Sequence, residues 1–293
     1  MRYNTLIMTL FGVVLASCSS GTSDIDAFKL PKNEAQRDAL TTFAHRTVPV
    51  DNWQNFCSAP REEIEAKITL IGDAQGWDQA TLDTIRKQEA KRIKDLQLKY
   101  APKPTVTASE LTTDIAIGKA IRNLEAYDQF WASAIVRYPE LATEIPEKNR
   151  LVFGLIFNEA QCKESDYALA ALKSILDVSD FPNDERFGKG TSRSLFLLTQ
   201  HADEDVKLQK KILTKFRANP DSLPATAIAL LTDRVKINQG QPQIYGSQLE
   251  CTDNGYKPKP VENPDELDAR RASVGLEPIA DYVATNPGCG NSF

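Results

Sequence analysis

Apolar residues recur every three or four positions along most of this chain, and this spacing constrains the fold more than any other feature. Between Thr107 and Pro139 the residues that share one helical face are Ile117, Ile121, Leu124, Tyr127, Trp131, Ile135 and Tyr138. Thr107 and Glu110 have the spacing of a capping box, so we expect this helix to begin near Thr107. A stripe of this kind can line a ligand groove, but it more often packs inside a protein, and we interpret it as core.

The same periodicity predicts further helices on both sides of this segment. They are expected at Asn33–Thr47, from Pro60 through Ile71, from Leu82 to Tyr100, at Arg150–Cys162, Ser165–Val178, Ser192–His201, Asp203–Phe216, Pro224–Lys236, Asp265–Val274 and Pro278–Ala284. No segment alternates strongly enough for a large sheet, and the polar stretch from Asn238 to Gly255 suggests a turn or a small hairpin. We therefore predict a mainly α protein with a bundle-like arrangement of helices in two halves.

Loop-forming residues divide the chain at 180–190, where Phe181-Pro182 and Gly188-Lys189-Gly190 interrupt the helical pattern. We expect an N-terminal helical region at 33–179 and a C-terminal helical domain at 180–293. The Gly188-Lys189-Gly190-Thr191-Ser192 sequence lacks the full spacing of a phosphate-binding loop and a preceding strand, so we reject that interpretation.

The first residues have the three parts of a secretory signal: a positive charge at Arg2, an apolar stretch from Leu6 to Ala16, and small residues before Cys18. The apolar stretch is too short to span a membrane. Leu15-Ala16-Ser17-Cys18 resembles the lipobox of bacterial lipoproteins. This resemblance implies a signal peptide at 1–17, lipid (such as palmitate) on Cys18, and a tether at 18–32. Ser19, directly after the cysteine, resembles the residue found in lipoproteins that are sorted to the outer membrane. We therefore expect the protein to be anchored there, facing the periplasm.

If Cys18 carries lipid, four cysteines remain, and an even number in an exported protein suggests disulfides. Three pairings are open. We favour Cys57–Cys162 and Cys251–Cys289, because this arrangement keeps one bridge in each half of the chain.

Composition excludes several classes of partner. The formal net charge is −5, with no long run of Lys or Arg, so a nucleic-acid partner is not expected. No cluster of His or Cys has the spacing of a metal site, and no cofactor is indicated.

The polar residues that attract most attention lie in the C-terminal half. They form four short elements: Gln200-His201-Ala202-Asp203, Asp233-Arg234-Val235, Gln243-Ile244-Tyr245-Gly246-Ser247-Gln248, and Asp268-Ala269-Arg270-Arg271-Ala272-Ser273-Val274-Gly275-Leu276. Here the sequence resembles an uncharacterised bacterial family, a domain of unknown function, over about residues 181–282. The resemblance supports grouping these elements into one site, and it implies no established activity.

These residue types suit a polar pocket. His201 titrates near neutral pH, and Asp203 or Asp233 could orient its ring. The side chains that could clamp an anionic group or add hydrogen bonds are Arg234, Arg270, Arg271, Gln243, Tyr245 and Gln248. The alternative is structural: a His can cap a helix end, and the Asp–Arg pairs can form ion pairs under a loop. We expect an envelope lipoprotein that binds a partner or a small anionic ligand, or alternatively an envelope hydrolase or transferase with His201 as general acid/base.

Overall fold

The computed structural model describes residues 61–137, 145–252 and 255–285, and within these ranges the protein is mainly α-helical, as predicted. The α-helices are α3 (Arg61–Gln75), α4 (Gln79–Tyr100), α5 (Asp114–Arg137), α7 (Arg150–Val178), α8 (Asp184–Phe187), α9 (Thr191–His201), α10 (Val206–Ala218), α11 (Ala225–Asn238), α12 (Leu267–Ser273) and α13 (Ile279–Ala284). Short 3-10 turns are η4 (Glu147–Asn149), η5 (Pro220–Ser222) and η6 (Pro264–Glu266). Strands β1 (Leu249–Thr252) and β2 (Gly255–Pro258) form an antiparallel hairpin, with Leu249 opposite Pro258. The signal peptide, the tether and the predicted helix at 33–47 lie outside the described residues.

The long helix predicted from Thr107 begins later, at Asp114. The Glu110 carboxylate does accept hydrogen bonds from the backbone N–H and the hydroxyl of Thr107 (3.2 and 2.8 Å). These contacts close an isolated turn, in which the Glu110 N–H donates to the Thr107 carbonyl. The helix then starts behind Thr113, whose hydroxyl accepts from the Ala116 N–H. The prediction that this helix begins near Thr107 was therefore wrong, because an isolated turn precedes the helix.

A second difference concerns residues 150–178, where two helices were predicted and one continuous helix, α7, is found. Ser165 does not act as an N-cap, because the chain before it is already helical. Neither Gly nor Pro separates Cys162 from Ser165, and Lys163 and Glu164 both favour helix.

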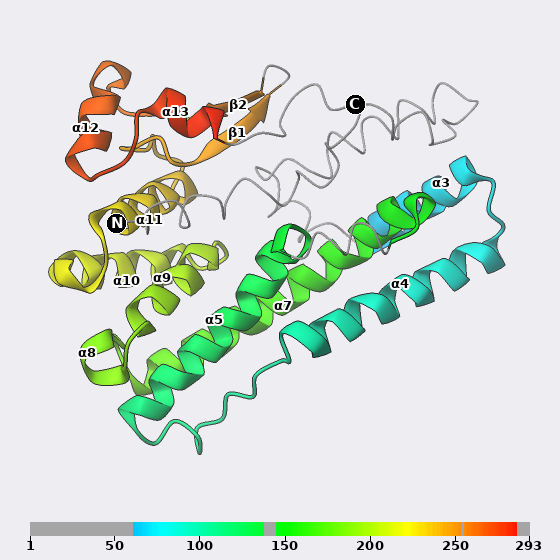
Figure 1. The fold of residues 1–293 in the computed structure, drawn as a ribbon, viewed down its shortest axis with the longest axis horizontal. Helices are drawn as coiled ribbons and strands as arrows, with labels where there is room; N and C mark the ends of the chain where they lie inside the picture. Colours follow the sequence, from blue (N-terminus) through cyan, green and yellow to red (C-terminus); the bar gives the residue numbers. More distant parts are fainter. Residues whose placement is uncertain (1–60, 138–144, 253–254, 286–293) are drawn as a thin grey trace.

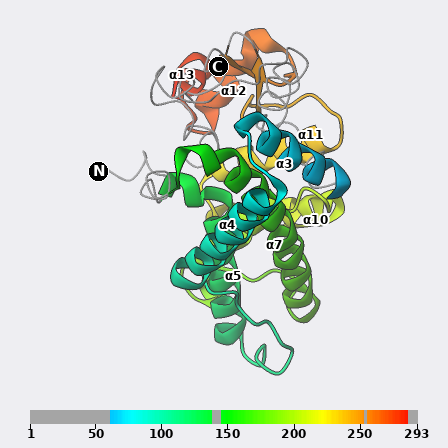
Figure 2. The ribbon, with the colours of Figure 1, turned by 90° about the vertical axis from the view of Figure 1, so that its right-hand side faces the viewer.

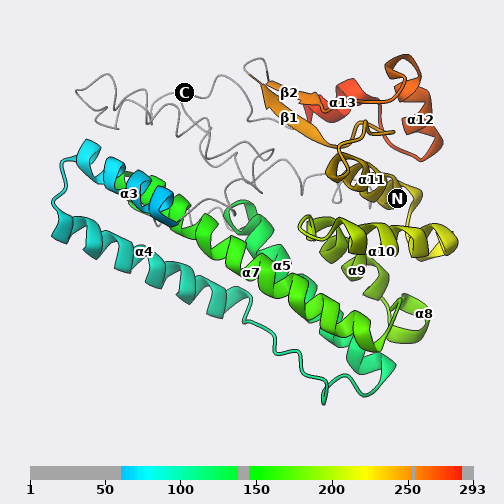
Figure 3. The same cartoon turned by 180° about the vertical axis from the view of Figure 1, so that it is seen from behind.

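The helices form an elongated body with a compact group at one end (Figure 1). Helices α4, α5 and α7 run side by side along the long axis, and α3 packs at the far end of α4 and α7. Helices α8 to α11 gather at the opposite end, and the hairpin with α12 and α13 lies beyond α11, as the view from behind also shows (Figure 3). The view turned by 90° (Figure 2) shows α4, α5 and α7 grouped together below the C-terminal elements.

Three apolar clusters hold the described part together. The largest combines side chains of α5, α7, α9, α10 and α11, including the fully buried Ile121, Ile175, Leu195 and Phe216. It therefore includes residues from both sides of position 180, and the division of the chain there stays a prediction. The other two clusters lie between α4, α5 and α7 and between α3, α4 and α7.

The aromatic stripe of α5 is core, as interpreted: Tyr127 and Trp131 are both buried and meet edge to face. Of the described helices, none is long and apolar enough to cross a membrane.

Candidate functional site

Helices α5 and α9 are joined by a row of polar contacts that ends at His201. Helix α5 approaches α8 closely at Gly118, where an added Cβ would lie 1.9 Å from the Phe187 carbonyl oxygen. One turn further, Arg122 donates to the Thr191 hydroxyl (2.7 Å), and Glu125 pairs with Arg193 (3.3 Å). These contacts fix the register between the two helices.

The row continues to an Asp–His pair at the end of α9. The Nδ1 atom of His201 lies 2.5 Å from Oδ2 of Asp128. The Asp128 carboxylate is buried, while about a fifth of the His201 side chain, 20%, is exposed to solvent. The imidazole therefore has a fixed carboxylate on one side, and most of the side chain is buried.

Two charges besides that of Asp128 act on His201, those of Arg234 and Asp203. Burial of the imidazole and the positive charge of Arg234 both lower the pKa of His201. The Asp128 carboxylate, through its charge and its hydrogen bond, and the charge of Asp203 outweigh them. The pKa of His201 is therefore raised above its ordinary value, which favours the positively charged imidazolium.

Arg234 and Asp203 complete this group, which we call the interhelix cluster: Asp128, His201, Asp203 and Arg234. The Arg234 Nη1 atom lies 3.5 Å from Oδ2 of Asp203. The other Asp203 oxygen accepts hydrogen bonds from Gln209 (3.1 Å) and Asn238 (2.7 Å). The cluster thus combines side chains of α5, α9 and α11 with the turn after α9.

A second polar group holds the loop at residues 243–248. Asp233 on α11 is fully buried, and its carboxylate accepts the backbone N–H groups of Ile244 (2.8 Å), Tyr245 (3.0 Å) and Ser247 (2.9 Å). Burial raises the pKa of Asp233, and these hydrogen bonds to the carboxylate oppose the rise. Asp233 therefore does not orient the ring of His201, a role that Asp128 fulfils instead.

The carbonyl groups of the same loop are bound from the opposite side. Arg270 Nε donates to the Ile244 oxygen (2.9 Å), and Arg271 Nη1 to the Tyr245 oxygen (2.6 Å). The Tyr282 hydroxyl donates to the Ser247 oxygen (2.9 Å). Burial raises the pKa of Tyr282 to about 12, so this hydroxyl keeps its proton. Both arginines thus bind main-chain carbonyls of the protein itself, and their role in binding a ligand stays a prediction.

Gln243 completes the binding of the loop through its side-chain amide. The amide donates to the Gln248 and Lys259 carbonyls and accepts the Gln248 N–H, at 2.8 to 2.9 Å. The loop clamp, as we call this group, consists of Asp233, Gln243, Arg270, Arg271 and Tyr282.

The predicted site residues therefore separate into two groups. His201, Asp203 and Arg234 meet in the interhelix cluster, whereas Asp233, Gln243, Arg270 and Arg271 form the loop clamp. Tyr245 and Gln248 belong to the clamped loop itself, with partly exposed side chains. The two groups adjoin at the neighbouring residues Asp233 and Arg234.

Asp128 is the site residue that sequence reasoning missed. It lies four residues after Leu124 and three before Trp131, and so on the apolar face of the helix. It is buried there, and a buried carboxylate requires a partner. A charged residue in the register of an apolar stripe was the signal that could have identified it.

The Gly188-Lys189-Gly190 loop binds a carboxylate of the protein itself. Asp184 accepts the backbone N–H groups of Gly190 (3.0 Å) and Ser192 (2.7 Å). This side chain takes the donors that a phosphate loop would offer to a ligand, which agrees with the rejection of that interpretation. Among the described residues no group of three or more His, Cys, Asp or Glu side chains is placed to hold a metal ion.

Comparison with known proteins finds a family match, which covers the segment where the sequence resembles a domain of unknown function. Residues 160–287 match a family of unknown function, DUF6624. The match begins within α7, before the segment in which the resemblance was first seen, and it includes His201 and Arg234 but not Asp128. No curated protein and no solved structure matches the chain.

Proposed function

We propose that this protein is a lipid-anchored protein of the bacterial envelope that binds an anionic group of a small ligand or partner between His201 and Arg234. The observation that carries the proposal is that two cations belong to one cluster: His201 contacts Asp128 at 2.5 Å, Arg234 contacts Asp203 at 3.5 Å, and the charge of Arg234 lowers the pKa of His201. Two like charges held near each other are stabilised by an anion between them. About a fifth of each side chain is exposed, 20% for His201 and 19% for Arg234, so both can reach a solute.

The neighbouring carboxylates support this arrangement. Asp128 favours the charged form of His201, and Asp203 is held in place by Gln209 and Asn238 as well as facing Arg234. The protonated cluster then contains two positive and two negative charges. A bound anion would make contacts with both cations without requiring a large excess of positive charge on the free protein.

Coupling between protonation and anion binding tests this function directly. The chain has two histidines, so His45→Gln leaves His201 as the one imidazole to follow by NMR. Acetate and inorganic phosphate serve as probes. We expect either anion to raise the pKa of His201, because an anion stabilises the imidazolium. Arg234→Ala is expected to weaken the apparent anion affinity by about tenfold, which corresponds to one charge-assisted contact.

The matched control is Arg186→Ala, which removes an exposed arginine from the Asp114 pair on α8 and α5. Its anion affinity is expected to equal that of the parent protein. A pKa of His201 that does not respond to either anion, or equal weakening in both arginine variants, would contradict the proposal.

A second function is favoured by the short contact between Asp128 and His201. A carboxylate on Nδ1 fixes the tautomer and leaves Nε2 as the atom that exchanges protons, as required of a general acid/base. The hydrolase or transferase alternative is therefore retained. Turnover of chromogenic carboxylate and phosphate esters by the full chain tests it, and Asp128→Asn is expected to reduce any turnover by about 10²–10⁴-fold. Absence of turnover for both ester classes would leave anion binding as the function.

The envelope location rests on the Leu15–Cys18 sequence and is tested separately. Metabolic labelling with palmitate is expected to mark the wild-type chain and not the Cys18→Ser variant, which should leave the membrane fraction. Labelling of both chains, or of neither, would remove the lipid anchor from the proposal. Localisation to the outer membrane is checked by fractionation of the labelled protein.

The disulfides also stay a prediction, because Cys57 and Cys289, one member of each proposed pair, lie outside the described residues. Non-reducing peptide mapping is expected to find Cys57 joined to Cys162 and Cys251 joined to Cys289. Any other pairing of these four cysteines would overturn the arrangement.

A further inference from the structure

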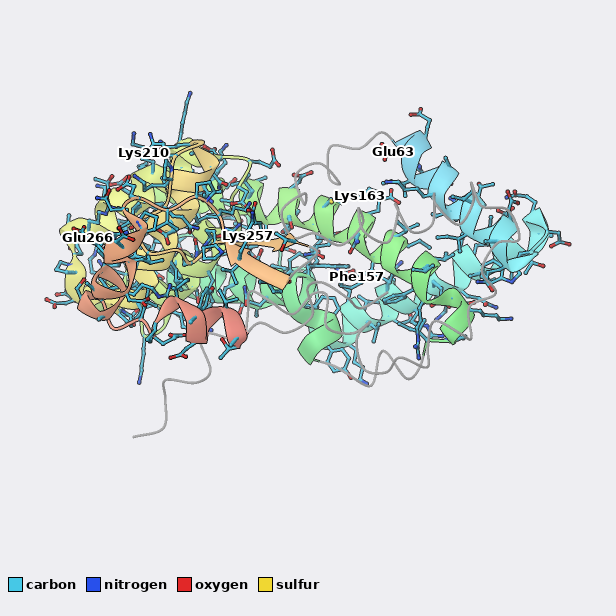
Figure 4. All side chains as sticks on the ribbon, turned by 90° about the horizontal axis from the view of Figure 1, so that it is seen from above. Glu63, Phe157, Lys163, Lys210, Lys257 and Glu266 are labelled. Carbon is cyan, nitrogen blue, oxygen red and sulfur yellow. The ribbon has the colours of Figure 1, made fainter. Side chains whose placement is uncertain are left out.

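Helix α10 is unusual in that all of its five charged side chains are cationic. Its residues include Lys207, Lys210, Lys211, Lys215 and Arg217, and no acidic residue at all. Figure 4 shows Lys210 at the periphery of the molecule. Most of these cations are exposed on the side of the helix that faces away from the core.

Exposed helix faces elsewhere in the described part carry both positively and negatively charged side chains. On α3, Lys67 pairs with Glu63, and on α4, Lys91 pairs with Asp95. Such alternation is the usual composition of a solvated helix surface. A helix with five cations and no acid, in a chain with a net charge of −5, is therefore a local concentration of positive charge.

The acidic groups that face α10 neutralise this surface only in part. Asp180 pairs with both Lys211 and Lys215, at 2.8 Å for Lys211. Asp205 caps the start of the helix, and its other oxygen pairs with Lys173 of α7. Lys207, Lys210 and Arg217 are exposed as well and add to the positive field.

We propose that the exposed face of α10 docks electrostatically on an anionic lipid surface. Lys207, Lys210 and Lys211 would lie against the headgroups. The apolar face of α10 is unavailable for insertion, because Ile212 and Phe216 are fully buried in the main core. The attraction therefore depends on charge alone and is sensitive to salt.

The composition of this face favours a membrane over a protein partner. Protein interfaces are enriched in aromatic residues and depleted in lysine, and they need an apolar centre. The uncharged exposed residues of α10 are small, Thr214 and Ala218, and offer no such centre. Binding to a layer of anionic headgroups requires positive charge on the protein and little shape complementarity. The exposed face of α10 presents such a surface.

Co-sedimentation with vesicles tests the proposal without the lipid anchor. The full chain carrying Cys18→Ser is mixed with vesicles of phosphatidylcholine containing phosphatidylglycerol, and with vesicles of phosphatidylcholine alone. We expect binding to the anionic vesicles at low salt and release at high salt. Adding Lys207→Glu and Lys210→Glu is expected to weaken partitioning by about tenfold or more.

The matched control reverses two exposed lysines of α4, Lys87→Glu and Lys94→Glu, which changes the net charge equally. This variant is expected to bind nearly as well as the parent, and circular dichroism checks that both variants fold. Equal weakening in the two variants, or no binding to anionic vesicles, would overturn the proposal. Binding to soluble polyglutamate but not to vesicles would overturn it in favour of an acidic protein partner. Because Cys18 is absent, neither result depends on the lipid anchor or on His201.

Discussion

Asp233 and Arg234 are neighbours on α11, yet they belong to polar groups of opposite character. Asp233 is fully buried, and its carboxylate accepts hydrogen bonds from backbone N–H groups of one loop. Arg234 is partly exposed and faces side chains that titrate or carry charge. The loop clamp therefore fixes a shape, whereas the interhelix cluster changes its charge with pH.

The comparison teaches how to separate structural from functional residues in a polar motif. A side chain that binds main-chain groups within the protein has its hydrogen-bonding capacity used by the fold. A side chain whose partners are other ionisable side chains can exchange them for a ligand or a proton. By this criterion Arg270 belongs to the fold, Arg271 does so in part because its buried Nη2 atom has no hydrogen-bond partner among the described residues, and His201 and Arg234 carry the proposed function.

The largest expected effect is the loss of Asp233. Asp233→Ala leaves the buried N–H groups of Ile244, Tyr245 and Ser247 without their acceptor. At about 1–3 kcal/mol for each unsatisfied donor, with partial relaxation of the loop, we expect a loss of about 4 kcal/mol in the free energy of unfolding. Urea denaturation measures it.

Asp180→Ala is the matched control, because it removes an exposed carboxylate that pairs with Lys211 and Lys215. Its effect on the free energy of unfolding is expected to be far smaller. If both variants lose similar stability, Asp233 does not hold the loop as described.

The next largest effect on the free energy of unfolding is expected from a substitution of Asp128, and this effect depends on pH. The pKa of His201 is raised in the folded state, so the Asp128–His201 pair stabilises the fold below the ordinary pKa of 6.5. This contribution is lost as the pH rises through the raised value. Asp128→Asn is expected to cost about 2 kcal/mol near pH 6, and less at alkaline pH.

Unfolding free energies of the parent and Asp128→Asn, both with His45→Gln, measured between about pH 6 and pH 9, provide the measurement. We expect the two curves to converge as the pH rises. A constant difference across this range would show that protonation of His201 is not coupled to Asp128.

A smaller loss in the free energy of unfolding is expected from Gly246→Ala within the loop at residues 243–248. Gly246 has a φ of +66°, and an added Cβ would lie 3.3 Å from both Ile279 and Leu267. An alanine in this left-handed conformation costs about 1–2 kcal/mol in the free energy of unfolding. Thermal or urea unfolding detects a change of this size.

Gly154→Ala on α7 is the control, because an added Cβ there meets no atom within 4 Å and the backbone is helical. This variant is expected to be neutral or slightly more stable, since alanine favours helix. Equal destabilisation of the two variants would mean that the conformation of Gly246 is not the cause.

Much of the fold could be predicted from the chain because helical periodicity is local. The apolar spacing located α4, α9 and α11 to within a few residues. Two boundaries were wrong for local reasons too: the Thr107–Glu110 contacts close a turn instead of starting a helix, and nothing interrupts α7 at Ser165.

The site could be predicted only in part, because its decisive contact joins two distant segments. His201 was recognised from its type and setting, but Asp128 lies 73 positions away, among the residues of a helix face predicted to be apolar. The polar elements at 233 and 243–248 were correctly grouped, yet their common purpose is to satisfy backbone groups. Whether an arginine faces a carbonyl or a cation is a property of tertiary structure, and spacing in the sequence does not contain it.

The smallest expected effect on stability, and the sharpest distinction between the two groups, comes from Arg234→Ala. The ion pair of Arg234 with Asp203 is long, 3.5 Å, and partly exposed, so loss of this pair is expected to cost less than about 1 kcal/mol in the free energy of unfolding. Its effect on His201 is expected to be clear, because Arg234 lowers the pKa of that imidazole. Arg234→Ala should therefore raise the pKa of His201, whereas Asp128→Asn should lower it. NMR titration of both variants in the His45→Gln background measures the two shifts. Shifts of the same sign would show that the Arg234 side chain does not act on His201 through its charge, and the anion site proposed between them would then lose its basis.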